Sequence, residues 1–266
     1  ATGEDRMSIV EQRDHLVKKW LKEIAKDIKS ALKKELEVEV KSRKNDLVTE
    51  MDRKIERDLV SKIKENFPDD FIISEEGYGD EISVNEFEQQ TVWFLDPIDG
   101  TLNFVLQKEN FAVMLAVYDK GIGQQTYIYD VQRDKLYWAI KGRGVYCNDQ
   151  PLPKMKDIGL ENGLFASNSM FLSNEQVEFN TEITKLSMGV RTIGSAGLEA
   201  CELVKGSTVA YVSYGLRPWD VAPGLMMVQE SGGVVTTFDG KEVNPLNGSP
   251  TIMGTPSAQR TISNLL

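Results

Sequence analysis

Two aspartates end a run of bulky apolar residues in the segment WFLDPIDGT, residues 93–101. Asp96 and Asp99 stand three residues apart around a proline, which fixes the backbone and removes one hydrogen-bond donor. A turn would use the same residue types, because Asp, Pro and Asp-Gly pairs are common in turns. Carboxylates also end other elements, however: Glu75 follows a short apolar strand and Asp220 opens a helix. Together these positions indicate a cluster of carboxylates.

Clustered carboxylates repel one another and raise one another's pKa unless a cation holds them. The chain contains one histidine and two cysteines, so a metal site built on this cluster would use oxygen ligands. Oxygen-only ligation favours Mg²⁺ or another hard ion over zinc.

Gly100 and Thr101 follow the second aspartate directly. A glycine and a small hydroxyl residue at a turn that opens a short helix present backbone N–H groups to an anion, as in many phosphate sites. Cations beside such a site would polarise a phosphate, lower the pKa of a bound water and neutralise the leaving oxygen. The sequence therefore predicts phosphoryl chemistry that needs no serine, cysteine or histidine nucleophile.

Length and composition are those of a globular protein, with 266 residues, 41% hydrophobic and 27% charged. The net charge of −10 disfavours a protein that binds the nucleic-acid backbone through a broad basic face. The longest apolar run, residues 111–118, is far shorter than the ~20 residues that a membrane-spanning helix needs. We therefore expect no nucleic-acid or membrane partner. Cys147 and Cys201 form no recognisable disulfide framework, which favours a cytoplasmic protein.

Hydrophobic periodicity predicts a first half that mixes helices with antiparallel strands. Apolar residues at three- and four-residue spacing predict a helix over 10–32, and alternation predicts a half-buried strand over 36–40. A capping box of Thr49 and Asp52 predicts a second helix that runs to Phe67. An acidic loop then precedes the central strands. The further strands of this half are predicted at 71–73, 92–95, 111–118, 125–130 and 135–140.

Strands and helices alternate in the second half, which is typical of a layered α/β unit. Turn-forming residues at 148–153 predict a hinge, so we divide the chain into an α+β half over 7–150 and an α/β half over 151–266. The predicted elements of the second half are strands at 164–167, 190–193, 209–212 and 233–237 and helices at 174–188, 196–205 and 219–230.

Three motifs in this order resemble the signature of the inositol monophosphatase family, the lithium-sensitive, magnesium-dependent sugar phosphatases. They are SEEG at 74–77, DPIDGT at 96–101 and PWDVAPG at 218–224. The segments KNDLVTEMD at 44–52 and GSAG at 194–197 fit the same family. The resemblance covers nearly the whole chain. It implies an α/β fold, a layered αβαβα sandwich, and a homodimer.

The resemblance also implies a role for each matching residue. Its metal ligands would be Glu75, Asp96, the Ile98 carbonyl, Asp99 and Asp220. Asp46 and Thr101 would orient the attacking water, with Glu75 as a further catalytic residue, and the Gly100 and Thr101 amides would hold the phosphate. Two or three Mg²⁺ ions would bind, with Mn²⁺ as a possible substitute. Its substrate-binding residues would be Gly194, Ser195, Ala196 and Ser213. Arg217, three residues before Asp220, is a further candidate on spacing alone: its guanidinium either binds a second phosphate or a hydroxyl, or packs against the N-terminus of the helix.

Inositol 1-phosphate, hydrolysed by metal-activated water, is the substrate that the resemblance favours. The 2′-phosphate of NADP, a nucleotide 3′-phosphate and fructose 1,6-bisphosphate stay open. Ser213 stands seven residues before Asp220, where family members that hydrolyse inositol phosphate well often carry a glutamate. Pro223 is a second departure, since the motif usually has alanine there. We expect little consequence, because proline is tolerated in the first turn of a helix.

Two other functions stay open on the residues alone. Phosphatases of the haloacid dehalogenase type carry D-x-D-G-T with a nucleophilic first aspartate, whereas the spacing here is D-x-x-D-G-T and the motif lies deep in the chain. A regulatory domain that binds divalent cations would use the acidic loop over 80–88, although a solvated loop has the same composition. Metal-dependent release of inorganic phosphate separates an enzyme from such a binding domain.

Overall fold

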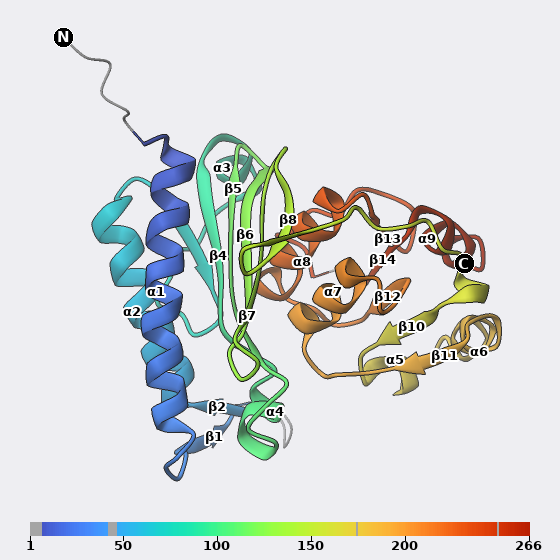
Figure 1. The fold of residues 1–266 in the computed structure, drawn as a ribbon, viewed down its shortest axis with the longest axis horizontal. Helices are drawn as coiled ribbons and strands as arrows, with labels where there is room; N and C mark the ends of the chain where they lie inside the picture. The colour runs from blue at the N-terminus through green and yellow to red at the C-terminus, as the bar shows by residue number, and fades with distance from the viewer. Residues whose placement is uncertain (1–6, 42–46, 174, 249) are drawn as a thin grey trace.

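The computed structural model describes residues 7–41, 47–173, 175–248 and 250–266. It contains two large sheets with helices on and between them (Figure 1). In order, the layers are a helix pair, a seven-stranded sheet, a second helix pair, a five-stranded sheet and outer helices. This layered α/β sandwich confirms the predicted fold class.

Two amphipathic helices form the first layer. They are α1 (Ile9–Ala31) and α2 (Glu50–Asn66), and α2 begins at the predicted capping box of Thr49 and Asp52. Their apolar faces pack on one side of the larger sheet. The buried residues of this contact include Val17, Leu21, Ile28, Ile55, Leu59 and Ile63. Within the described ranges, no helix combines the length and apolar composition that a membrane crossing requires.

The larger sheet carries the predicted central strands. Its strands, in spatial order, are β3 (Phe71–Ser74), β4 (Thr91–Asp99), β5 (Ala112–Asp119), β6 (Ile122–Asp130), β7 (Lys135–Ile140), β8 (Gly144–Cys147) and β9 (Gln150–Leu152). β3 and β4 are parallel, and the other neighbours are antiparallel. Helices cover both faces, so β4 and β5 are apolar along most of their length.

Three short segments differ from the prediction. The ribbon of β1 (Val38–Val40) and β2 (Leu47–Thr49) leaves β1 exposed, so the strand predicted at 36–40 is not half-buried. The predicted acidic loop contains a helix, α3 (Val84–Gln89), which a Ser-Glu capping box begins. The predicted hinge at 148–153 forms β9, the edge strand of the larger sheet. The domain boundary placed there stays a prediction.

The second half alternates strands and helices as predicted. Its strands, in spatial order, are β11 (Gly189–Arg191), β10 (Leu164–Ser167), β12 (Ala210–Ser213), β14 (Thr251–Gly254) and β13 (Val234–Thr237). Its helices are a 3₁₀ turn (Leu160–Asn162), α5 (Met170–Ser173), α6 (Val177–Leu186), α7 (Ala196–Lys205), α8 (Pro218–Glu230) and α9 (Pro256–Ser263). β14 and α9 were not predicted, and β14 joins β12 to β13 by antiparallel pairing.

α7 and α8 fill the space between the sheets, and side chains of the larger sheet anchor α8 (Figure 1). The Tyr118 hydroxyl donates to the Ala222 carbonyl at 2.6 Å, and the Thr126 hydroxyl donates to the Pro223 carbonyl at 2.8 Å. Pro223 is the sixth residue of α8, so it lies beyond the first turn in which we expected it. It lacks the N–H that would bond to the Trp219 carbonyl. The sheet therefore holds α8 at the carbonyls beside its proline.

Removing the Tyr118 hydroxyl tests how strongly the sheet holds α8. Tyr118→Phe takes away a buried donor to the Ala222 carbonyl, and we expect the free energy of unfolding to fall by about 1–3 kcal/mol. Urea denaturation in EDTA measures this change. Tyr78→Phe, at an exposed tyrosine, is the matched control and should change stability by less than about 0.5 kcal/mol. Equal effects of the two substitutions would contradict the anchoring role.

Candidate active site

Three carboxylates from two distant parts of the chain meet where β4 ends and α8 begins. Asp96, Asp99 and Asp220 each place one oxygen within 4.8 Å of the other two. Asp96 and Asp99 are only 1% and 5% exposed. The structure thus brings together three of the residues that the sequence predicted as metal ligands.

A shift in strand pairing turns both β4 carboxylates toward this cluster. In a regular strand, residues three apart point to opposite faces. Asp96 pairs with Met114 and Asp99 pairs with Ala112, so β4 contains one residue more than β5 over this stretch. Pro97 lies between Asp96 and Asp99, where the register shifts, and has no N–H for a hydrogen bond to the neighbouring strand. Such a β-bulge re-aims a side chain, and here it puts both aspartates on the same side.

Burial raises the pKa of every carboxyl group in the cluster, and the charges of neighbouring carboxylates raise it further at Asp96, Asp99 and Glu75. Burial, with the charge of Asp220, raises the pKa of Asp99 to about 7. Glu75, which follows β3, has its pKa raised to about 9 by burial and by the same aspartate. Burial and then the charge of Glu75 raise the pKa of Asp96 well above its usual range. A cation at this position would offset the repulsion that Asp96, Asp99 and Glu75 experience.

The N-terminal end of α7 holds Asp99. The Gly197 N–H donates to Asp99 Oδ2 at 2.7 Å, and the Ser195 hydroxyl donates to the same oxygen. A Cβ on Gly197 would collide with a methionine sulfur and with this carboxylate, so the close approach of α7 requires glycine. Ser195, predicted to contact substrate, is buried and bonded to Asp99. Of its predicted substrate-binding neighbours, Gly194 is exposed and Ala196 is half-buried.

Thr101, the first residue of α4 (Thr101–Leu106), donates its hydroxyl proton to Asp52 Oδ1 at 2.8 Å. Asp52 is fully buried on α2, and burial raises its pKa to about 6. The other Asp52 oxygen accepts the Thr49 N–H of the capping box at 3.1 Å. Because the Thr101 hydroxyl donates to Asp52, the lone pairs of the Thr101 oxygen can accept a hydrogen bond from water.

The partner predicted for Thr101 is Asp46, which lies outside the described residues. Sequence reasoning missed Asp52 as a site residue because the capping box already explained an acid at that position. A signal was nevertheless present. A capping aspartate has two oxygens, and the box uses only one of them. The structure shows that the remaining Asp52 oxygen meets Thr101.

Gly100 turns the chain into α4, at the position predicted to hold phosphate. Its φ of 89° lies in the left-handed region that favours glycine. The N–H groups of Gly100 and Thr101 therefore begin the helix beside the carboxylate cluster. Asn103 fixes this turn against the second half of the chain, since its amide donates to the Ile193 carbonyl at 2.8 Å and to the Asn110 carbonyl at 2.9 Å.

The two residues predicted to set substrate choice lie in different surroundings. Ser213 is fully buried at the end of β12, and its hydroxyl shares a 2.6 Å hydrogen bond with Thr251 of β14. A substrate does not reach Ser213 in this conformation, because pairing with β14 covers it. Arg217 is exposed, and its backbone N–H donates to Asp220 Oδ2 at 3.0 Å. The Arg217 side chain therefore begins next to the carboxylate cluster.

The donor set fits a hard divalent cation. Asp96 Oδ1 is buried and has no hydrogen-bond partner among the described residues, whereas buried polar atoms normally have one. Asp99 and Asp220 lie beside it, and the charge of Glu75 acts on Asp96. The Ile98 carbonyl, in the bulge, accepts the Thr101 hydroxyl at 3.1 Å. All of these groups present oxygen atoms, which Mg²⁺ and Mn²⁺ prefer.

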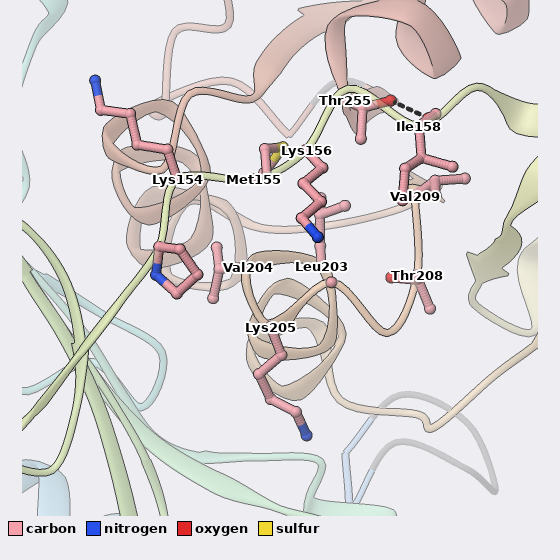
Figure 2. A pocket seen from close by; sticks show the side chains of 12 residues that line it. Lys154, Met155, Lys156, Ile158, Leu203, Val204, Lys205, Thr208, Val209 and Thr255 are labelled. Atoms are coloured by element: carbon pink, nitrogen blue, oxygen red, sulfur yellow. Dashed lines mark hydrogen bonds between the residues drawn. The ribbon is translucent and has the colours of Figure 1, made fainter.

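A pocket of about 320 Å³ lies at the C-terminal end of α7 (Figure 2). Lys154, Lys156 and Lys205 line it, and Figure 2 shows the side chains of Lys154 and Lys205 pointing outward. The opposite end of α7 holds Asp99. The described lining residues of this pocket include none of the predicted site residues. It is therefore separate from the carboxylate cluster.

Known proteins share this sequence and this arrangement of elements. The sequence model of the inositol monophosphatase family matches residues 10–265. The chain is 37% identical over 252 residues to the inositol-1-monophosphatase of Bacillus subtilis (strain 168), with 94% of each chain covered. It is 34% identical over 208 residues to the fructose-1,6-bisphosphatase/inositol-1-monophosphatase of Thermotoga maritima, over 78% of this chain and 77% of that protein.

The fold is similar to the crystal structure of an IMPase/NADP phosphatase complexed with Mg²⁺ and phosphate. The TM-score is 0.89 at 28% identity, and the match covers 97% of this chain and 96% of the other. The match to the family model extends over nearly the whole chain. This chain therefore belongs to the inositol monophosphatase family of phosphatases.

Proposed function

We propose that this phosphatase hydrolyses inositol 1-phosphate or a related small phosphate ester with Mg²⁺ as its cofactor. The observation that carries the proposal is the cluster of Asp96, Asp99 and Asp220, with its unpartnered buried oxygen, beside the Thr101–Asp52 pair. The named activity of the Bacillus subtilis relative supports the substrate class. Membership of a phosphatase family disfavours a purely regulatory cation-binding domain.

The cation ligands would be Glu75, Asp96, the Ile98 carbonyl, Asp99 and Asp220. When bound, two or three Mg²⁺ ions, or Mn²⁺ in their place, would polarise the phosphate, lower the pKa of the attacking water and neutralise the leaving oxygen. The chain fixes these ligands before any ion arrives. The bulge in β4 aims two of them, and α7 and the start of α8 supply N–H donors to two.

Thr101 and Asp52 would orient the attacking water, together with Asp46 as the family motif implies. Asp52 accepts the hydrogen bond of the Thr101 hydroxyl, so the Thr101 oxygen is left to accept a hydrogen bond from water and to point that water at phosphorus. The N–H groups of Gly100 and Thr101 would donate to the phosphate oxygens. No activated serine, cysteine or histidine is required, and we expect direct hydrolysis without a phosphoenzyme.

The 2′-phosphate of NADP is the second candidate substrate, ahead of a nucleotide 3′-phosphate and fructose 1,6-bisphosphate. The exposed Arg217 beside the cluster favours this substrate, because its planar guanidinium can donate two hydrogen bonds to a further phosphate. The naming of the structural relative as an IMPase/NADP phosphatase supports the same choice.

We further propose a cytoplasmic homodimer. Leu106, Val177 and Met188 are 72%, 65% and 70% exposed, and covering their apolar surface in a dimer would stabilise the assembly. Cys147 and Cys201 are both free, which fits a reducing compartment. Light scattering of the purified protein tests the dimer, and a monomeric mass at micromolar concentration would contradict it.

Asp96→Asn tests the metal site by activity and by the stability of the metal-free protein. We expect phosphate release to fall at least about 100-fold. The raised pKa values, about 7 for Asp99 and about 9 for Glu75, mean that the folded protein keeps protons that the unfolded chain loses. Their contribution to stability is complete near pH 4 and is lost as pH rises through 7 and 9. Metal-free wild type should therefore weaken from pH 6 to pH 9.

The variant should weaken less over this range, because one repelling charge is gone. Urea unfolding in EDTA at pH 6 and pH 9 measures both proteins. Glu178→Gln, at an exposed position of α6, makes the same charge change far from the cluster and should follow wild type. Metal-free Asp96→Asn that is clearly less stable than wild type at pH 9 would contradict a site built on repulsion.

Thr101→Val tests the orientation of the attacking water. It keeps the size of the side chain and removes the hydroxyl, so we expect kcat to fall by about 10²–10⁴-fold. Binding of Mg²⁺, measured by calorimetry, should stay unchanged, because the Thr101 side chain is not a proposed ligand. Thr101→Ser keeps the hydroxyl and should retain most of the activity. A kcat for Thr101→Val within threefold of wild type would exclude the proposed role.

Phosphate release from inositol 1-phosphate, NADP, a nucleoside 3′-phosphate and fructose 1,6-bisphosphate separates the candidate substrates. If Arg217 binds a further phosphate, Arg217→Ala should lower kcat/KM for NADP about 10–100-fold relative to inositol 1-phosphate. Arg260→Ala, on α9, is the control with the same loss of charge. Equal losses on every substrate would mean that Arg217 only supports Asp220.

A further inference from the structure

α2 carries two fully buried carboxylates one helical turn apart, Asp52 and Glu56. Residues four apart lie on the same face of a helix, so both side chains leave α2 in the same direction. Asp52 meets Thr101. Glu56 carries the same chemical group into an equally buried position, which is unfavourable unless its oxygens are bonded.

Both oxygens of Glu56 accept backbone N–H groups from one turn. Oε1 accepts from Glu76 at 2.7 Å, and Oε2 accepts from Tyr78 at 3.0 Å. The two donors flank Gly77, whose φ of 88° lies in the left-handed region. Hydrogen bonds from backbone N–H groups to a carboxylate are among the stronger ones in proteins. With these two hydrogen bonds, Glu56 fixes the backbone of the turn at 75–78.

Glu75 belongs to this turn, and hydrogen bonds hold the backbone both before and after it. On one side, β3 is paired with β4 up to the contact of Ser74 with Leu95. On the other side, the Glu76 N–H is bonded to Glu56. Because the backbone is held before and after Glu75, its side chain can extend toward Asp220. The negative charge of Asp220 contributes to the raised pKa of the Glu75 carboxyl group.

Lys41 lies against the same turn. Its ammonium is 3.8 Å from Glu75 Oε1 and 3.3 Å from Glu76 Oε1. The Glu75 and Glu76 side chains are 27% and 6% exposed, so both carboxylates are largely shielded from water. An ammonium between two carboxylates can draw either one toward it. The bonds from Glu56 keep the backbone of the turn in place against that pull.

We propose that Glu56 is a positioning residue, which sets the direction of Glu75 and through it the affinity of the site for divalent cations. The inference rests on the proposed function, because it takes Glu75 as a cation ligand. Two N–H donors need two acceptor oxygens, and only a carboxylate supplies both. A glutamine at this position would turn its NH₂ group against one of the donors and open the turn.

Glu56→Gln is the test, with binding of Mn²⁺ to the substrate-free protein measured by electron paramagnetic resonance. Removing a residue that orients a metal ligand typically weakens metal binding about 10–100-fold, and we expect a loss in this range. Glu75→Gln should lose affinity in the same direction. At saturating Mg²⁺, kcat of Glu56→Gln should return to within threefold of wild type, with an unchanged KM for inositol 1-phosphate.

Asp80→Asn is the matched control, because Asp80 Oδ2 accepts the Ile72 N–H at 3.0 Å near the other end of β3. Its Mn²⁺ affinity should equal that of wild type. Glu56→Asp keeps both acceptor oxygens on a shorter side chain and should show an intermediate loss. If Glu56→Gln does not fold, Mn²⁺ binding by Glu56→Asp alone tests the proposal.

Unchanged Mn²⁺ binding in the Glu56 variants, or an equal loss in Asp80→Asn, would overturn the positioning role. Failure of the proposed function gives a different result, since wild type itself would then bind no Mn²⁺ or release no phosphate. A normal wild type with unaffected Glu56 variants therefore rejects only this inference.

Discussion

Repulsion among buried carboxylates is the constraint on which the rest of this structure depends. Asp96, Asp99 and Asp220 place oxygens within 4.8 Å of one another in a site that is largely closed to water. Taking charges of one sign out of water and placing them together is unfavourable. Burial raises the pKa of all three, and neighbouring carboxylates raise it further at Asp96 and Asp99. The apolar layers on both faces of the larger sheet have to stabilise the fold against this local cost.

Both halves of the chain hold the cluster in place. β4 brings two of the carboxylates, whereas Asp220 and the N–H donor of Gly197 come from the second half. Asn103 bonds across the same boundary to the Ile193 carbonyl, and Tyr118 bonds to α8. The site therefore exists only when the two halves are docked. Rigid supports of this kind keep ligand oxygens at fixed positions, which a small cation with strict geometry requires.

The carboxylate cluster could be predicted from the sequence because each of its carboxylates ends a strand or opens a helix. The contact of Asp52 with Thr101 could not, since a capping box fully accounts for that residue and only the fold shows its second oxygen against Thr101. The burial of Ser213 depends on β14, a four-residue strand between polar segments. The sequence did not predict α3, because acidic residues surround Phe87, its one buried side chain, and no apolar periodicity results. In each case, contacts from elsewhere in the chain decided the outcome.

Cation binding and folding are coupled in such a site. In the unfolded chain Asp96 and Asp220 are separated by more than 120 residues, so a cation finds no preformed set of ligands there. A ligand that binds only the folded state stabilises it by RT ln(1 + [L]/Kd). The repulsion that weakens the metal-free protein is the same interaction that a bound cation removes. The more tightly the helices hold the carboxylates together, the less these side chains must move when a cation binds. The fold therefore gains affinity for the cation at the expense of the stability of the metal-free protein.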